Sequence, residues 1–69
     1  MSSKDILENS VQKVRKEKGV TQEQLAEAVG VTRQTIISIE KGNYVPSVLL
    51  AMKIASYFNL KIENLFTIK

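Results

Sequence analysis

The sequence contains no cysteine and no histidine, and these two absences exclude several classes of protein. Without cysteine there is no disulfide framework and no thiol nucleophile, and without either residue a zinc finger has no ligands. Catalysis by a histidine base is excluded as well. Tryptophan is also absent and aromatic residues make up only 6% of the chain, so the core must be aliphatic. We therefore expect no metal site and no cofactor.

Long apolar runs and a signal-peptide pattern are also missing, which predicts a cytoplasmic protein with no membrane partner. The 69 residues form one domain, residues 1–69. A core of this size rarely supplies more than about 3–5 kcal/mol, and small proteins usually add disulfides, a metal or a partner subunit. Only the partner subunit remains here, so we expect a homodimer. The net charge of +3 fits a polyanionic partner, although the excess is small.

The three glycines, Gly19, Gly30 and Gly42, each fall where a helix should stop. Glycine adopts the left-handed conformation that ends many helices at no steric cost. The segments between them predict a helix over about 4–18, one that begins after Thr21, and one that begins after Thr32. Further helices are predicted over about 48–58 and 62–66, with residues 67–69 extended or frayed. The expected fold is therefore all-α with five helices.

Residue types at the predicted helix starts support these boundaries. Thr21 and Gln24 have the spacing of a capping box, Thr32 is a common N-cap residue, and Ser47 after the single proline can cap the helix from residue 48. The first helix has an apolar stripe, because its apolar residues recur at i, i+4 and i+7. These residues are Leu7, Val11 and Val14.

The helix after Thr32 divides into two faces when it is drawn at 100° per residue. Ile36, Ile39 and Glu40 fall on one side, which we expect to meet the core. The other side lacks acidic residues and carries a mixture of polar, basic and apolar groups. Its members are Arg33, Gln34, Ile37, Ser38 and Lys41.

This outward face suits the edges of DNA bases in the major groove. Arginine bonds bidentately to guanine, glutamine bonds to adenine, and an apolar side chain contacts the thymine methyl. Arg33, Gln34 and Ile37 offer these three modes within five residues. The alternative is a polar helix face that happens to lack acids. Ala26 and Gly30 favour the DNA interpretation, because small residues permit the close, steep crossing of a helix-turn-helix.

The chain resembles the Cro/phage-repressor helix-turn-helix family, with the motif at residues 22–41. The matching residues extend over about 11–66. They are Gln22, Ala26, Gly30, Ile36 and Ile39, then Thr21, Leu25, Ala28, Val31, Gln34, Thr35, Glu40 and Gly42, then Pro46, Ser47, Ala51, Ile54, Ala55, Leu65 and Phe66. The resemblance implies a compact five-helix lambda-repressor-like DNA-binding domain, with the helix after Thr32 in the major groove.

The resemblance also implies roles for individual residues. It implies base contacts from Arg33, Gln34 and Ser38, with Thr32 near the backbone or a thymine methyl. Gln22 is expected to donate to a phosphate and to brace Gln34, and Arg15 to form a structural ion pair with Glu40. The remaining phosphate contacts are implied for Thr21, Lys41, Asn43 and Tyr44.

Residues 60–69 carry more apolar groups than so small a core can hide: Leu60, Ile62, Phe66 and Ile68. In short relatives of the family this region forms the dimer contact, sometimes with a small terminal strand. The alternative is that Phe66 covers the monomer core and Ile68 frays. Leu49 and Ile37 stand where relatives of the family usually carry polar residues, and Lys61 replaces a capping residue. Leu49 either faces a partner subunit or lies on the surface.

Three functions remain open at this point. The leading one is a sequence-specific regulator of transcription, a dimeric repressor that binds double-stranded DNA at a near-palindromic operator, with no small-molecule ligand. The second is an antitoxin or controller protein that also binds a protein partner through its C-terminal region. The third is a helical protein-interaction module. An enzyme is not expected, since no nucleotide loop and no acidic cluster with metal-ligand spacing accompany the missing histidine and cysteine.

Overall fold

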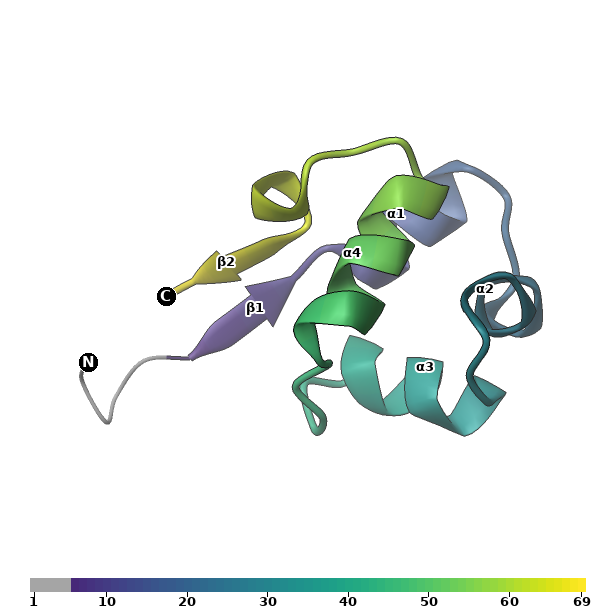
Figure 1. Ribbon diagram of the computed structural model, residues 1–69, viewed down its shortest axis with the longest axis horizontal. Helices are drawn as coiled ribbons and strands as arrows, with labels where there is room; N and C mark the ends of the chain where they lie inside the picture. The colour runs from purple at the N-terminus through teal and green to yellow at the C-terminus, as the bar shows by residue number, and fades with distance from the viewer. Residues whose placement is uncertain (1–5) are drawn as a thin grey trace.

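Residues 6–69, the part of the chain described by the computed structural model, form four α-helices, one short 3-10 helix and a two-stranded sheet. Figure 1 shows the helices packed around one centre, with the sheet beside them and α3 along one edge of the molecule. No helix in this part of the chain has the length and apolar composition to cross a membrane. In chain order the elements are β1 (Leu7–Asn9), α1 (Val11–Glu17), α2 (Gln22–Val29), α3 (Arg33–Glu40), α4 (Val48–Tyr57), the 3-10 helix η1 (Ile62–Asn64) and β2 (Phe66–Ile68).

The predicted boundaries of α2 and α3 are confirmed, and their caps explain them. The hydroxyl of Thr21 accepts the backbone N–H of Gln24 at 3.0 Å, and the side-chain oxygen of Gln24 accepts the N–H of Thr21 at 2.8 Å. Helix α2 then ends at Gly30, which has a φ of 77°. Only glycine adopts this left-handed conformation routinely. Two residues later the Thr32 hydroxyl accepts the N–H of Thr35 and starts α3.

The core is aliphatic, as the composition predicts. Ile36 and Ile39 place the inner face of α3 at its centre, and both are fully buried. Burying a side chain of this size contributes roughly 1.5–3 kcal/mol, so these two residues hold α3 firmly against the rest of the domain. The largest fully buried side chains are Leu25, Ile36, Ile39, Ile54, Leu65 and Val11.

The prediction of a first helix over 4–18 is wrong at its N-terminal end. The predicted start at Lys4 lies outside the described residues, and the helix begins at Val11. Leu7 belongs to β1, where it lies opposite Ile68 of the antiparallel partner strand. The side-chain oxygen of Asn9 accepts the N–H of Val11 at 3.1 Å and separates strand from helix. Asparagine commonly offers the backbone this alternative to a continued helix.

The predicted helix over 62–66 is also wrong, so the all-α fold with five helices is correct only for its four α-helices. Only Ile62–Asn64 are helical, as the single-turn η1, and Lys61 before them makes no side-chain cap. Phe66 belongs to β2 and pairs with Asn9. The strand pairing continues past both ends of the sheet, with Ser10 N–H bonded to the Leu65 carbonyl at 2.9 Å. These long-range bonds outweigh the local helical periodicity.

Candidate nucleic-acid interface

The outward edge of α3 is accessible over its first turns. Thr32, Arg33 and Gln34 are exposed, whereas Ile37 and Ser38 are half-buried. The buried side chains of Ile36 and Ile39 fix this rotation of the helix, as the helical wheel predicts. All five predicted base-reading residues therefore lie on or beside the surface of one helix edge.

A recess of about 260 Å³ lies between α3 and the loop that follows it. The backbone N–H of Asn43 donates to the Ser38 carbonyl at 2.9 Å and holds the loop against the helix. Thr35 also borders the recess, and the sequence analysis gave it no role; its hydroxyl lies 3.0 Å from that of Thr32. The lining is rich in hydroxyl and amide groups, which can both donate and accept hydrogen bonds. It consists of Thr32, Gln34, Thr35, Ser38, Asn43 and Tyr44.

A second recess, of about 740 Å³, lies at the N-terminal end of α2. It brings the predicted phosphate residues Thr21 and Gln22 together with Arg33 of α3, and with Arg15 and Lys16 of α1. The N–H groups of a helix's first turn and nearby cations both favour an anion. Lys16 is exposed, and the sequence alone favours a surface lysine without a specific role at this position.

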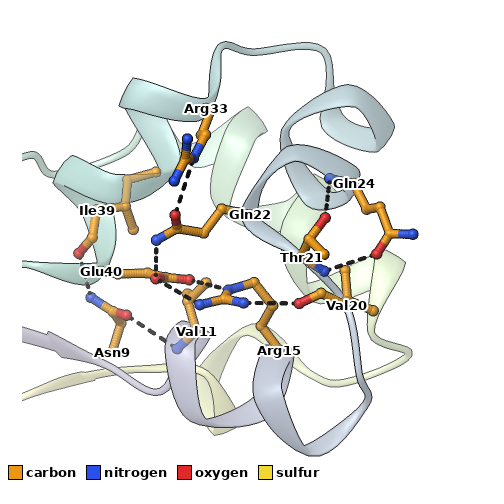
Figure 2. A network of polar contacts seen from close by, with 10 residues as sticks. All are labelled: Asn9, Val11, Arg15, Val20, Thr21, Gln22, Gln24, Arg33, Ile39 and Glu40. Carbon is orange, nitrogen blue, oxygen red and sulfur yellow. Dashed lines mark hydrogen bonds and ion pairs between the residues drawn. The ribbon is translucent and has the colours of Figure 1, made fainter.

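Behind this recess, Arg15 and Glu40 form the ion pair that the family resemblance implies (Figure 2). Arg15 Nε donates to Glu40 Oε2 at 2.7 Å, and Arg15 Nη2 donates to Oε1 at 3.3 Å. The remaining terminal nitrogen donates to the Val20 carbonyl at 2.9 Å. Only 2% of the Glu40 side chain and 10% of the Arg15 side chain are exposed, so the pair joins α1 to the last turn of α3 largely shielded from water.

Gln22 continues this network toward the surface. Its Nε2 donates to Glu40 Oε1 at 3.0 Å, and its Oε1 accepts from Arg33 Nε at 3.3 Å. The expectation that Gln22 braces Gln34 is therefore wrong. Among the described residues, the side chain of Gln22 bonds to Glu40 and Arg33, whereas Gln34 borders the recess between α3 and the loop that follows it.

Asn9 is a further structural residue that sequence analysis did not identify. Its side-chain nitrogen donates to the Ile39 carbonyl at 3.0 Å, while its side-chain oxygen accepts from Val11. The carbonyls of a helix's last turn lack partners within the helix, so this bond ties the end of α3 to β1. The pair Asn9-Ser10 directly before Val11 was the available signal, since both are common residue types at helix starts.

Other predicted site residues lie apart from the two recesses. Lys41 and Ile37 border neither of them. Of the predicted dimer residues, Leu60 and Phe66 are half-buried against the core of their own chain. Ile62 is 37% exposed and Ile68 is 72% exposed. Within residues 6–69 no acidic cluster could hold a metal ion.

Comparison with known proteins identifies the fold and the family together. The family model described as helix-turn-helix matches residues 11–65. The uncharacterized HTH-type transcriptional regulator YgzD of Bacillus subtilis is 53% identical over 60 residues, covering 87% of this chain and 91% of its own length. The uncharacterized HTH-type transcriptional regulator MJ0272 of Methanocaldococcus jannaschii is 52% identical with the same coverage.

A solved structure extends the comparison to three dimensions. The restriction-modification controller protein C.AhdI from Aeromonas hydrophila superposes with a TM-score of 0.74 at 26% identity, over 78% of this chain and 82% of its own. These relatives are named as regulators, and the family is not one of enzymes. The chain belongs to the Cro/phage-repressor type of DNA-binding helix-turn-helix transcriptional regulators.

Proposed function

We propose that this protein is a sequence-specific regulator that binds double-stranded DNA with α3 in the major groove. The observation that carries the proposal is the exposed edge of α3, where Arg33 and Gln34 stand free of the core while Ile36 and Ile39 anchor the helix. Arginine and glutamine are the side chains that bond bidentately to guanine and adenine. A helix held by its buried face can present them without further rearrangement.

Groups suited to phosphate flank α3 on two sides, which supports this orientation. Thr21 and Gln22 border the recess at the start of α2, and Asn43 and Tyr44 border the recess after α3. A helix in the major groove has a phosphate backbone on either side. The residues at the start of α2 therefore suit the phosphates of one DNA strand, and those after α3 suit the phosphates of the other. The Gln22 amide nitrogen carries two N–H groups. One bonds to Glu40, which leaves the other for a phosphate.

We further propose that the regulator acts as a homodimeric repressor on a near-palindromic operator. Two recognition helices of a dimer bind half-sites about 34 Å apart. Ile62 and Ile68 are exposed on the C-terminal segment, within the predicted dimer region at residues 60–69. Leu60 and Phe66 contribute to the core of the subunit itself, so Ile62 and Ile68 are the stronger candidates for contact with a second copy.

A controller role is the second candidate. The observation that favours it is the similarity to C.AhdI, which is named a restriction-modification controller protein. In this alternative the DNA contact is the same, but the C-terminal region also binds a protein partner, as an antitoxin would. Co-purification of the tagged chain from its native host separates the repressor from the controller. A protein partner that co-purifies with the parent, but not with a variant carrying Ile62→Asp and Ile68→Asp, favours the controller role.

Selection of bound sequences from a random duplex pool at physiological salt tests the proposed function directly. We expect an enriched motif with two half-sites whose centres are one helical turn apart. Arg33→Ala and Gln34→Ala should each relax one position of the half-site, at a cost of about 1–3 kcal/mol. Enrichment of no motif, or identical motifs for the parent and both variants, would exclude readout by this edge of α3.

A further inference from the structure

We propose that Asn9 of β1 is a positioning residue for DNA binding, which holds the turn after α3 at residues 41–43 and is itself held by β2. The C-terminal strand therefore affects DNA affinity without contacting DNA. This inference rests on the proposed function, because it assumes that the turn binds phosphate. Both strands lie outside residues 11–65, which match the family model, so the sheet is not part of the helix-turn-helix motif itself.

The side chain of Asn9 connects the N-terminal strand to the last turn of α3 (Figure 2). Its Nδ2 donates to the Ile39 carbonyl at 3.0 Å, and its Oδ1 accepts the N–H of Val11 at 3.1 Å. A carbonyl only accepts hydrogen bonds and a backbone N–H only donates them, so these two neighbours determine the orientation of the amide. A flipped amide would lose both bonds.

The Ile39 carbonyl also anchors the turn that follows α3. It accepts the backbone N–H of Gly42 at 3.0 Å, so its two lone pairs are shared between the turn and Asn9. Gly42 lies between Lys41 and Asn43, two of the residues expected to contact phosphate. The last carbonyls of a helix lack partners within the helix, and helix ends fray readily. Asn9 therefore holds the acceptor to which the turn is bonded.

The position of Asn9 depends in turn on β2. Asn9 lies opposite Phe66 in the antiparallel pair, and the next residue, Ser10, donates its N–H to the Leu65 carbonyl at 2.9 Å. Leu65 is fully buried and Phe66 packs against the core, so the core anchors β2. Among the described elements, β1 makes most of its contacts with β2. A two-stranded pair is marginally stable in water by itself, so β1 keeps its place through this anchored neighbour.

The strand β2 lies apart from the surfaces proposed to contact DNA. Of the described residues that border the recess at the start of α2 or the recess after α3, none belongs to β2. A change in β2 therefore reaches the phosphate contacts through the fold. The bonds of Asn9 supply a direct route, because they join the strand pair to the end of α3.

The test measures one phosphate contact, as the ratio of Kd for a duplex with an uncharged methylphosphonate to Kd for the same duplex with a phosphate. The duplex carries the motif enriched by the parent, and the substituted phosphate is the one at which Lys41→Ala lowers this ratio. We expect a parent ratio of about ten, the order of one hydrogen bond to a charged group. Asn9→Leu should lower it about threefold, the order of one neutral hydrogen bond. Partial unfolding or weaker dimerisation raises both Kd values alike and leaves the ratio unchanged.

Two further variants show that the bond to α3 is being measured. Asn9→Asp keeps the oxygen that accepts from Val11 and loses the donor to the Ile39 carbonyl. It should lower the ratio as Asn9→Leu does, and it provides the same comparison if Asn9→Leu fails to fold. Asn64→Leu is the matched control, because it makes the same change at an exposed asparagine of η1, and it should keep the parent ratio.

Thr67→Pro tests the dependence on β2. Bonded residues alternate along antiparallel strands, and Ser10 and Lys69 donate across the sheet, so the N–H of Thr67 faces β1 as well. Proline removes this N–H, whereas Thr67→Ala keeps it and is the control. We expect Thr67→Pro to lower the ratio as far as Asn9→Leu does, and the double variant to lower it no further.

Failure of the proposed function and failure of the inference give different results. If Lys41→Ala lowers the ratio at no phosphate, phosphate binding by the turn is rejected, and the inference with it. If Lys41→Ala lowers the ratio while both Asn9 variants keep it, only the positioning role is rejected. If the Asn9 variants lower the ratio and Thr67→Pro keeps it, the dependence on β2 is rejected. Glu8→Pro, which removes the facing N–H of β1, replaces Thr67→Pro if that variant does not fold by circular dichroism.

Discussion

Replacing Arg15 by methionine should destabilise the domain severely, although Arg15 has no proposed contact with DNA. The substitution keeps much of the apolar stem and removes the charge. Three hydrogen bonds disappear, two to Glu40 and one to the Val20 carbonyl. Glu40 retains only the bond from Gln22 and remains a carboxylate with 2% of its side chain exposed. Breaking such a pair by removing one partner typically costs about 3–5 kcal/mol.

The lower end of that range applies here. The recess at the start of α2 reaches Arg15, so water can enter and solvate part of the carboxylate. We therefore expect a loss of about 3 kcal/mol, the value of two hydrogen bonds to a charged group at about 1.5 kcal/mol each. A domain of this size has about 3–5 kcal/mol in total, so most of its stability disappears. The melting temperature should fall by roughly 12–24 °C.

The assay is thermal and urea denaturation followed by circular dichroism. Lys13→Met is the matched control, because it removes one positive charge from an exposed position of the same helix; it should stay within about 0.5 kcal/mol of the parent. Arg15→Met combined with Glu40→Leu should regain at least half of the loss, since no buried charge remains. A loss below about 1 kcal/mol for Arg15→Met would refute the argument from the buried carboxylate.

Three other changes test separate parts of the molecule. Lys41→Ala should weaken all DNA sites about equally and lower the salt slope by about one; an unchanged slope removes Lys41 from the phosphate contacts. Gly30→Val should cost at least about 1–2 kcal/mol through its left-handed φ alone, since no atom lies within 4 Å of an added Cβ; unaltered melting would contradict this. Ile62→Asp with Ile68→Asp should yield folded monomers in sedimentation, and persistent dimers would place the interface elsewhere.

The sequence predicts the middle of this fold well because the signals there are local. Thr21 with Gln24 and the glycine at position 30 define α2 through contacts between near neighbours in the chain. The two ends could not be predicted in the same way. Leu7 has helical spacing relative to Val11 and Val14, but it pairs with Ile68, 61 residues away. Only a long-range contact decides between the two structures.

In the candidate site, too, the features that depend on local sequence could be predicted and those that depend on long-range contacts could not. The exposure of Arg33 and Gln34 could be predicted, because it follows from the 3.6-residue period of one helix. The hydrogen-bond partner of Gln22 does not follow from this period, because Arg33 and Gln34 are adjacent in sequence but border different recesses. Likewise, the recess beside Thr35 exists only because the loop after α3 folds back, through the bond from Asn43 to the Ser38 carbonyl. The sequence therefore indicates which residue types form the site, but the directions of their side chains depend on the fold.

The recognition helix is positioned by two kinds of force with different geometry. Ile36 and Ile39 draw α3 into the core, but apolar attraction is non-directional and would tolerate a small rotation about the helix axis. Hydrogen bonds have preferred directions and do not tolerate it. They act at both ends of α3, from Gln22 at the start and from Arg15 and Asn9 at the end. A rotation of α3 that preserved every apolar contact would still break these bonds. Ile36 and Ile39 therefore determine which face of α3 lies outward and how strongly the helix is held, and the polar network limits the small rotation that remains.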